Sequence, residues 1–280
     1  MSCQGNIDPR TVQSFGSEWS QFDQSTLSAD EHRTLFDLYF RIFPWEDLGA
    51  AVGFDMGCGS GRWARLVAPR VAHLTCIDPS VEALAVAKRN LSGQANVSFV
   101  LGSTDKPGVQ EGSQDFGYSL GVLHHIPNTD SALAQCVRLL KPGAPFLVYL
   151  YYNFDNKPGW YRLLWRCTEG FRHFVSRLPS RSKTIVTDPV AVLVYYPLAR
   201  LALICDRLGL DAKDMPLYGY RHASLYTMRT DSRDRFGTPL EQRFSRKEVA
   251  EMMRSAGLDD IVFSEQEPFW CAVGRKNGSH

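Results

Sequence analysis

Apolar positions follow two alternating patterns along most of the chain. From Ala51 onward, short apolar runs alternate with segments in which apolar residues recur every three or four positions. The short runs are expected to be strands, at residues 51–56, 73–77, 97–101, 116–123 and 145–151. The periodic segments between them are expected to be helices, at residues 62–68, 81–91 and 129–140. Because this alternation is typical of βαβ units, it predicts an α/β fold with a doubly wound, mostly parallel sheet.

The alternation stops after the fifth expected strand. Residues 153–242 show only helical patterns, rich in aromatic residues and arginine. A Ser-x-x-Glu capping box at Ser245 and Glu248 then begins a further helix, which is followed by expected strands at 261–264 and 270–273. We therefore predict three parts: an N-terminal helical arm or lid (1–50), a core (51–152 and 243–280), and a helical cap inserted after strand five (153–242).

Composition restricts the class of protein. A chain of 280 residues can bury a full apolar core, and a net charge of +1 disfavours a globally basic nucleic-acid binder. The seven cysteines are scattered, which favours free thiols in a reducing compartment. The polar N-terminal segment lacks the pattern of a secretory signal. The interrupted apolar run 190–204 is expected to be too short to span a bilayer. We expect a cytoplasmic protein with no nucleic-acid partner.

A glycine-rich turn follows the first expected strand, where residues 55–61 read Asp-Met-Gly-Cys-Gly-Ser-Gly. Such a turn lets the backbone approach a ligand and points the amide groups of the next helix at it. The G-x-G-x-G spacing differs from the G-x-G-x-x-G of dinucleotide-binding enzymes. Asp78 ends the second strand, where a carboxylate can accept the hydroxyls of a ribose. Residues 101–105 end the third, where an adenine ring would lie.

Four motifs, in this order, resemble those of class I S-adenosylmethionine-dependent methyltransferases, especially the small-molecule branch that includes the ubiquinone-biosynthesis enzymes. They are the glycine turn, Cys-Ile-Asp-Pro-Ser (76–80), Leu-Gly-Val-Leu-His-His-Ile-Pro (120–127) and Leu-Lys-Pro-Gly (140–143). The C-terminal segment 244–258 matches as well. The resemblance implies a Rossmann-like fold that binds S-adenosyl-L-methionine.

The resemblance also implies which residues bind this cofactor: Asp55, Gly57, Cys58, Gly59, Gly61, Asp78, Pro79, Ser103, Thr104 and Leu120. The glycines would pack against the methionine and ribose parts, and Asp78 would hold the ribose hydroxyls. Many relatives have an acidic residue for the adenine amino group where Ser103 stands, so Asp105 or a backbone carbonyl is the expected substitute. The alternative interpretation is a tight turn without a ligand, and the other motifs in register argue against it.

Methyl transfer chiefly requires alignment in a site shielded from water, and a general base only where the acceptor loses a proton. His124 and His125 are expected at the end of the fourth strand, on the edge where doubly wound folds bind ligands. Either is a candidate base; the alternative is that the pair only orders the turn before Pro127. Candidate substrate residues are Trp19, Tyr151, Tyr152, Asn153 and Tyr220.

Two absences from the sequence narrow the chemistry. No Asn-Pro-Pro-Tyr or Asp-Pro-Pro-Tyr motif, typical of many enzymes that methylate exocyclic amines of bases, follows the fourth strand. His124 stands where magnesium-dependent catechol-type enzymes place an acidic ligand, and Asn153 with Asp155 would not by themselves make an oxygen-rich site. These absences favour an enzyme without a metal.

The expected cap is strongly basic at its start. Between residues 153 and 183 the chain has seven basic and two acidic residues, a local charge of +5. Three interpretations remain open: a cap helix with a solvated basic face, a site for an anionic substrate, and an amphipathic helix in peripheral contact with anionic lipid. The apolar run 190–204 is a candidate for burying a long apolar ligand or for a dimer contact, so both a monomer and a homodimer are compatible.

The sequence thus predicts a methyltransferase that acts on an oxygen, in preference to a nitrogen, of a small-molecule, glycoconjugate or lipid-like acceptor. Two other hypotheses remain: a non-catalytic scaffold or sensor that binds S-adenosylmethionine, and, as the weaker one, an NAD-dependent oxidoreductase. The glycine spacing and the Leu-Lys-Pro-Gly turn disfavour the oxidoreductase.

Overall fold

The chain folds into two compact units in a computed structural model that describes residues 5–278. The core unit comprises Met1–Ser25, Arg33–Tyr152 and Leu240–His280, and the insertion unit comprises Thr26–His32 and Asn153–Pro239. Residues 1–4 of the predicted arm and 279–280 of the predicted core lie outside the described residues. The predicted arm is divided between the two units, and the core resumes at Leu240, slightly earlier than the predicted boundary.

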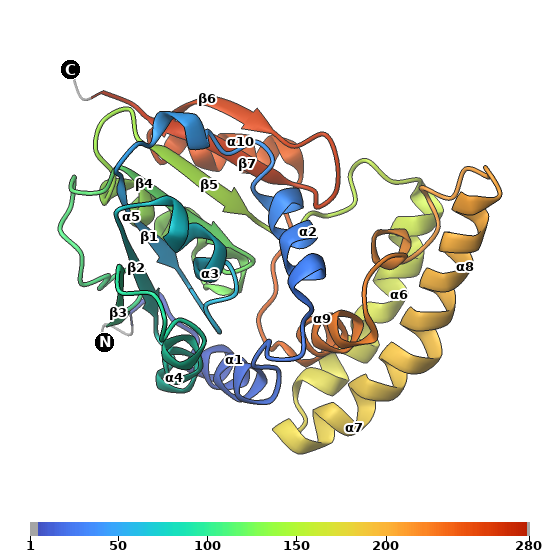
Figure 1. Ribbon diagram of the computed structural model, residues 1–280. Helices are drawn as coiled ribbons and strands as arrows, with labels where there is room; N and C mark the ends of the chain where they lie inside the picture. Colours follow the sequence, from blue (N-terminus) through green and yellow to red (C-terminus); the bar gives the residue numbers. More distant parts are fainter. Residues whose placement is uncertain (1–4, 279–280) are drawn as a thin grey trace. The chain divides into compact units, whose positions relative to one another are not determined.

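The core unit is built on a seven-stranded sheet in the order β3-β2-β1-β4-β5-β7-β6 (Figure 1). Its strands are β1 (Val52–Met56), β2 (His73–Asp78), β3 (Val97–Leu101), β4 (Phe116–Leu120), β5 (Pro145–Tyr149), β6 (Leu258–Phe263) and β7 (Cys271–Lys276). The first five strands, β1 through β5, are all parallel to their neighbours among these five, whereas β7 is antiparallel to both β5 and β6. The predicted doubly wound, mostly parallel sheet is therefore confirmed. Its order reverses at β1, the position where such sheets bind ligands.

Six α-helices contribute to this unit: α1 (Pro9–Gln21), α2 (Ala29–Tyr39, whose start belongs to the insertion unit), α3 (Ala64–Val67), α4 (Val81–Asn90), α5 (Thr129–Arg138) and α10 (Arg246–Ser255). Side-chain caps begin three of them. Ser80 accepts a hydrogen bond from the Ala83 amide and Asn128 from the Ser131 amide, and the predicted capping box of α10 is present. These caps hold α4 and α5 at the carboxyl edge of the sheet.

The fourth strand is shorter than predicted. It ends at Leu120 instead of residue 123, because Gly121 adopts φ +77° and turns the chain out of the sheet. Leu123–His125 then form a 3₁₀ turn, η3, so the histidine pair lies in this turn and not at the strand end. Other 3₁₀ turns are Trp45–Asp47, Ala68–Arg70 and Tyr218–Tyr220.

The insertion unit is helical, which confirms the helical insertion predicted after the fifth strand. Its elements are α6 (Gly159–Ser176), α7 (Ser180–Val190), a π-helical turn (Ala191–Tyr195), α8 (Tyr196–Arg207) and α9 (Leu225–Gly237) (Figure 1). Its basic residues are only partly solvated. Arg172 and Lys183 are buried and donate hydrogen bonds to the carbonyls of Thr238 (3.1 Å) and Gly237 (2.6 Å).

The apolar run 190–204 belongs to a longer helix than the sequence predicts. α7, the π-helical turn and α8 follow one another without a break over Ser180–Arg207, a stretch of 28 residues. By length and composition alone this stretch could cross a membrane, which corrects the expectation that the run is too short. About a fifth of its apolar window (22%) is buried inside the protein.

Candidate cofactor and methyl-transfer site

The glycine loop is tied to the neighbouring strand and closely covered. The amides of Gly57 and Cys58 both donate to the Ile77 carbonyl of β2, at 2.8 and 3.1 Å. Gly57 has φ +80°, and a Cβ atom there would lie 2.4 Å from the Val122 side chain. Gly59 has φ +53°, and its Cβ atom would lie 2.8 Å from the indole nitrogen of Trp19. Only glycine suits both the backbone conformation and the available space at these two positions.

We expect Gly57→Ala to lower the free energy of unfolding by about 2–5 kcal/mol, through left-handed backbone strain together with overpacking against Val122. Gly143→Ala is the matched control, because Gly143 has φ +78° but nothing within 4 Å of its Cβ position. Urea unfolding of the wild type and of the two variants measures the loss of unfolding free energy. Equal losses in the two variants would show that crowding by Val122 contributes nothing.

Two buried carboxyl groups lie at the ends of β1 and β2. Asp78 accepts the amide of Gly59 on one oxygen (2.9 Å) and the amide of Ser80 on the other (2.8 Å). Burial raises the pKa of Asp78 to about 6, against the opposing effect of these two hydrogen bonds. Burial also raises the pKa of Asp55 to about 8, against the opposing effect of its hydrogen bond with Tyr118.

Buried polar atoms that lack a hydrogen-bond partner within residues 5–278 gather after the ends of β1, β3 and β4. They are the hydroxyls of Ser60 and Thr104, and both ring nitrogens of His124. Buried polar groups in proteins are almost always hydrogen-bonded, so this group of atoms indicates a polar ligand at this edge. S-adenosylmethionine carries hydroxyl, amino and carboxylate groups that can form hydrogen bonds with these buried atoms. The glycine loop has no side chains at its glycines, so the cofactor can approach its backbone closely. The residues therefore fit the predicted cofactor.

The remaining predicted cofactor residues surround the same edge. Cys58 and Leu120 are buried, and Pro79 is exposed between Asp78 and the start of α4. The Ser103 amide donates to the Lys106 carbonyl at 3.1 Å, which closes the turn after β3. Asp105, the expected substitute for an adenine-binding acid, accepts the backbone amide of Asn6. The Asp105 carboxylate is therefore already hydrogen-bonded to the N-terminal arm, through Asn6.

Helix α1 lies along the carboxyl edge of the sheet. Besides the contact of Trp19 with Gly59, its Gly16 packs so tightly on α4 that a Cβ atom would lie 2.6 Å from the Ser80 hydroxyl. Phe15 places its ring 4.9 Å from the ring of His125. Helix α1 therefore lies against the glycine loop and reaches the histidine pair, and its action as a lid stays a prediction. That Trp19 contacts a substrate stays a prediction.

The two histidines of η3 have different environments. The ring of His124 is fully buried, stacked 3.9 Å from Tyr151, and burial lowers its pKa well below the usual value. His125 places Nδ1 2.7 Å from the Leu240 carbonyl, an acceptor that assigns the ring proton to Nδ1. In the neutral ring, Nε2 of His125 is then the basic nitrogen. Both rings stay candidates, and His125 has the tautomer that a base needs.

Two partly buried charged residues, which the sequence did not reveal, lie beside the histidine pair. Arg243 lies with its guanidinium 5.1 Å from the Tyr151 ring and donates to the Tyr152 carbonyl at 3.2 Å. Glu241 forms an ion pair with it at 2.7 Å. The chain returns here from the insertion, more than a hundred positions after His124. No local motif marks this segment, so its proximity to η3 could not be read from the sequence.

The predicted substrate residues do not all belong to one unit. Tyr151 lies against both histidine rings, and Tyr152 packs on Phe269 and Trp270, with ring centroids 5.6 and 6.3 Å away. Asn153 and Tyr220 belong to the insertion unit, where Tyr220 packs 5.5 Å from Tyr195. In the core unit, Trp19 and Tyr151 are thus the candidates that lie beside the glycine loop and the histidine pair.

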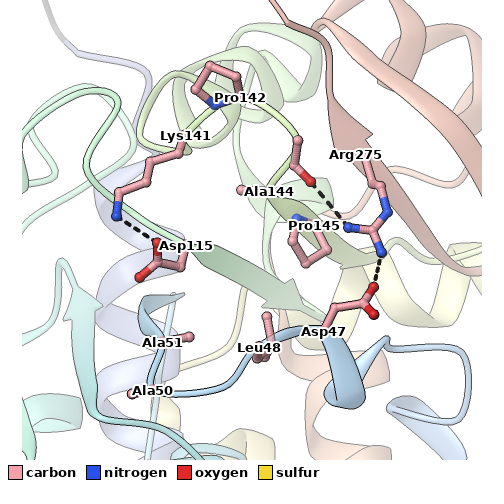
Figure 2. A pocket seen from close by; sticks show the side chains of 11 residues that line it. Asp47, Leu48, Ala50, Ala51, Asp115, Lys141, Pro142, Ala144, Pro145 and Arg275 are labelled. Atoms are coloured by element: carbon pink, nitrogen blue, oxygen red, sulfur yellow. Dashed lines mark hydrogen bonds and ion pairs between the residues drawn. The ribbon is translucent and has the colours of Figure 1, made fainter.

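A separate hollow of about 330 Å³ opens at the opposite, amino edge of the sheet, next to the starts of β1 and β5 (Figure 2). Its charged residues are already paired: Lys141 with Asp115 at 2.6 Å, and Arg275 with Asp47 (Figure 2). This hollow contains none of the predicted site residues. It is therefore not the cofactor site.

Comparison with known proteins agrees with this geometry. Residues 54–148 match a family model described as a methyltransferase domain. The chain is 33% identical over 145 residues to a ubiquinone biosynthesis O-methyltransferase of Aromatoleum aromaticum, a match that covers 49% of this chain and 60% of that protein. The chain thus spans less than two thirds of the length of this relative.

Two solved structures share the fold. An O-methyltransferase family protein from Burkholderia thailandensis has a TM-score of 0.55 at 13% identity, over 98% of this chain and 61% of that one. A phosphoethanolamine N-methyltransferase of Haemonchus contortus, bound to S-adenosylhomocysteine, has a TM-score of 0.51 at 17% identity, over 92% of this chain and 44% of that one. Residues 54–148 thus form a class I S-adenosylmethionine-dependent methyltransferase domain, distantly related to the ubiquinone-biosynthesis O-methyltransferases.

Proposed function

We propose that the protein transfers the methyl group of S-adenosylmethionine to a hydroxyl oxygen of a small-molecule, glycoconjugate or lipid-like acceptor. The observation that carries this proposal is the contact of His125 Nδ1 with the Leu240 carbonyl. It holds the ring in the tautomer whose Nε2 can accept a proton. A hydroxyl usually needs such a base on attack and a neutral amine often does not, so a held base favours oxygen over nitrogen.

When bound, S-adenosylmethionine supplies an electrophilic methyl group on a sulfonium. The chain's own residues would orient it: Asp78 accepts the ribose hydroxyls, and the glycine loop lets the backbone approach closely. Trp19 packs over Gly59, and we propose that it helps to exclude water from the loop. His125 would take the proton of the acceptor hydroxyl at Nε2, and Tyr151, stacked on the fully buried His124, would form the wall behind it.

A screen for methyl transfer from labelled S-adenosylmethionine tests the proposal. Phenolic, sugar and lipid-like hydroxyl acceptors are offered beside amine analogues of the same skeleton. We expect transfer to hydroxyl compounds and little to the matched amines. Faster transfer to the amines would refute the oxygen assignment. Calorimetry that shows tight binding of S-adenosylhomocysteine but no transfer to any acceptor would favour the scaffold hypothesis, and binding of NAD alone would favour the oxidoreductase.

The raised pKa of Asp78 predicts how cofactor affinity depends on pH. Above the pKa of about 6 the group is a carboxylate that accepts two ribose hydroxyls, and below it a bound proton removes part of this acceptor capacity. We expect the Kd for S-adenosylhomocysteine to rise about tenfold when the pH falls from about 7.5 to about 5. Calorimetry across this range measures it. Asp78→Asn should give a weaker but flatter profile, and an equally steep one would assign the effect to another group.

A small-molecule acceptor follows from the family. We further propose a cytoplasmic location, no nucleic-acid partner, and a monomer or homodimer in solution. Light scattering of the purified protein measures the oligomeric state, and a larger assembly would contradict this part of the proposal.

A further inference from the structure

Exposed apolar side chains gather in the insertion unit, and α6 carries the clearest stripe of them. Large apolar residues recur there every three or four positions and are exposed: Trp160, Leu163, Leu164, Phe171 and Phe174. Leu163 and Phe174 are each 63% exposed. This spacing places the five side chains on one face of the helix. A face this apolar is not usual on a soluble protein unless something covers it.

The helical stretch 180–207 also has one packed and one exposed side. Ala191 and Ala199 are buried in the core of the insertion unit, in a cluster that also contains Val175 and Met228. Exposed apolar residues of the same stretch and its end are Ile185, Val192, Leu193, Leu201, Ile204 and Leu208. A helix with one face packed on its own unit cannot be surrounded by lipid.

Two polar contacts tie the same stretch to its own unit. Asp188 forms an ion pair with Arg229 of α9, and Arg200 donates to the carbonyls of Arg221 (2.7 Å) and Ala223 (2.9 Å). Breaking these contacts to insert the helix across a bilayer would bury charged groups without partners. The stretch is therefore suited to lie on a membrane and not to span it.

Arginines border the apolar stripe of α6. Arg162, Arg166 and Arg177 are exposed, and at 100° per residue they fall on one flank of the helix, between the apolar stripe and the inward face. Among the described residues, 5–278, no ion pair involves these three arginines. By contrast Arg172, on the inward face, is paired with Glu169 at 3.0 Å. An apolar face beside a basic flank is typical of helices that lie in the interface of an anionic membrane.

We propose that the exposed faces of α6 and of the stretch 180–207 dock the protein on the surface of an anionic phospholipid bilayer. The apolar side chains enter the boundary between headgroups and acyl chains, and the flanking arginines bind lipid phosphates. A second copy of the chain is less well matched, because residues 153–183, which include α6, contain seven basic and two acidic residues, so that two copies of this segment would repel each other. Exposed Asp206 and Asp214 are already paired with Arg221 and Lys157. This inference does not depend on the proposed acceptor.

Co-sedimentation of the full chain with vesicles tests the proposal. One set of vesicles is phosphatidylcholine alone and the other also contains phosphatidylglycerol. We expect binding to the anionic vesicles, weak binding to the neutral ones, and partial release by salt. Absence of binding to anionic vesicles at low salt would overturn the proposal. Retention in the membrane after alkaline carbonate washing would overturn it too, in favour of a spanning helix.

Surface variants locate the contact. Leu163→Glu should abolish most of the binding, and Val262→Glu, a substitution at an exposed apolar residue of β6, should not. The triple variant Arg162→Gln, Arg166→Gln, Arg177→Gln should weaken binding on the order of a hundredfold. Its control removes three exposed basic residues of the core unit: Lys88→Gln, Lys247→Gln, Arg254→Gln.

Equal binding by each variant and its control would place the contact elsewhere and refute the proposal. A dimer of the wild type that Leu163→Glu converts to monomers, seen by light scattering, would instead identify a second copy as the occupant. Each variant is also tested for binding of S-adenosylhomocysteine, which should stay unchanged. Loss of lipid binding with intact cofactor binding separates this inference from the proposed enzymatic function.

Discussion

Replacement of Asp78 by alanine should weaken binding of S-adenosylhomocysteine by about 10²–10⁴-fold. A carboxylate that accepts two hydroxyls makes two charge-assisted hydrogen bonds, and each contributes about 1.5–3 kcal/mol. The same side chain also accepts the amides of Gly59 and Ser80, so its loss loosens the glycine loop. Titration calorimetry at about pH 7.5, where the carboxyl group with its pKa of about 6 is ionised, measures the change.

Two further variants separate ribose binding from loop geometry. Asp78→Asn keeps the shape and one acceptor oxygen, so we expect an intermediate affinity. Asp47→Ala removes a carboxylate of the amino-edge hollow, where it pairs only with Arg275, and should leave affinity unchanged. Unchanged affinity in Asp78→Ala, with unfolding like that of the wild type, would show that the ribose binds elsewhere.

The second large effect concerns the histidine pair. His125→Gln should lower kcat on the identified acceptor by about 10²–10³-fold and change KM little, because a general base contributes about this much. His125→Asn is the companion variant: its amide nitrogen stands as many bonds from Cα as Nδ1, so it can still donate to the Leu240 carbonyl while the base is removed. The rate of this variant should rise with pH as the acceptor hydroxyl ionises, whereas loss of a structural contact would give no such recovery.

His124→Gln is the comparison that assigns the role. Its ring is fully buried against Tyr151 and its pKa is held well below the usual value, so it is a weak base. We expect this variant to lose mainly stability, measured by urea unfolding, and to keep most of kcat. The opposite result, a large loss of kcat in His124→Gln with normal turnover in His125→Gln, would contradict the assignment.

Local patterns were sufficient to predict the sheet and the cofactor loop. Strand–helix alternation, the glycine spacing in 55–61 and the position of Asp78 are properties of neighbouring residues, so they can be recognised without knowing the tertiary structure. The end of the fourth strand was predicted three residues too late, because Val122 and Leu123 continue the apolar run. The chain turns earlier since Gly121 adopts a positive φ, which apolar periodicity does not encode.

Long-range contacts decided the rest of the site. An N-terminal arm or lid was predicted at residues 1–50, but only the folded chain places Trp19 on Gly59 and Phe15 beside His125. Arg243 was not recognised at all, because it meets Tyr151 only when the chain returns from the insertion. The +5 charge of residues 153–183 suggested a basic face without showing which arginines point inward. Which arginines are buried and which are exposed depends on which side of α6 packs against the rest of the insertion unit.

The sequence by itself therefore determined the methyltransferase domain, the sheet and the carboxylate expected to hold the ribose, because all three depend on short spacings along one chain segment. The tertiary structure alone decided which histidine has the tautomer of a base, since that follows from the Leu240 carbonyl more than a hundred residues away. It also decided which apolar side chains of the insertion stay exposed. Burial is a property of the packed fold. Helical periodicity identifies an apolar face of a helix, but it does not show whether another element covers that face.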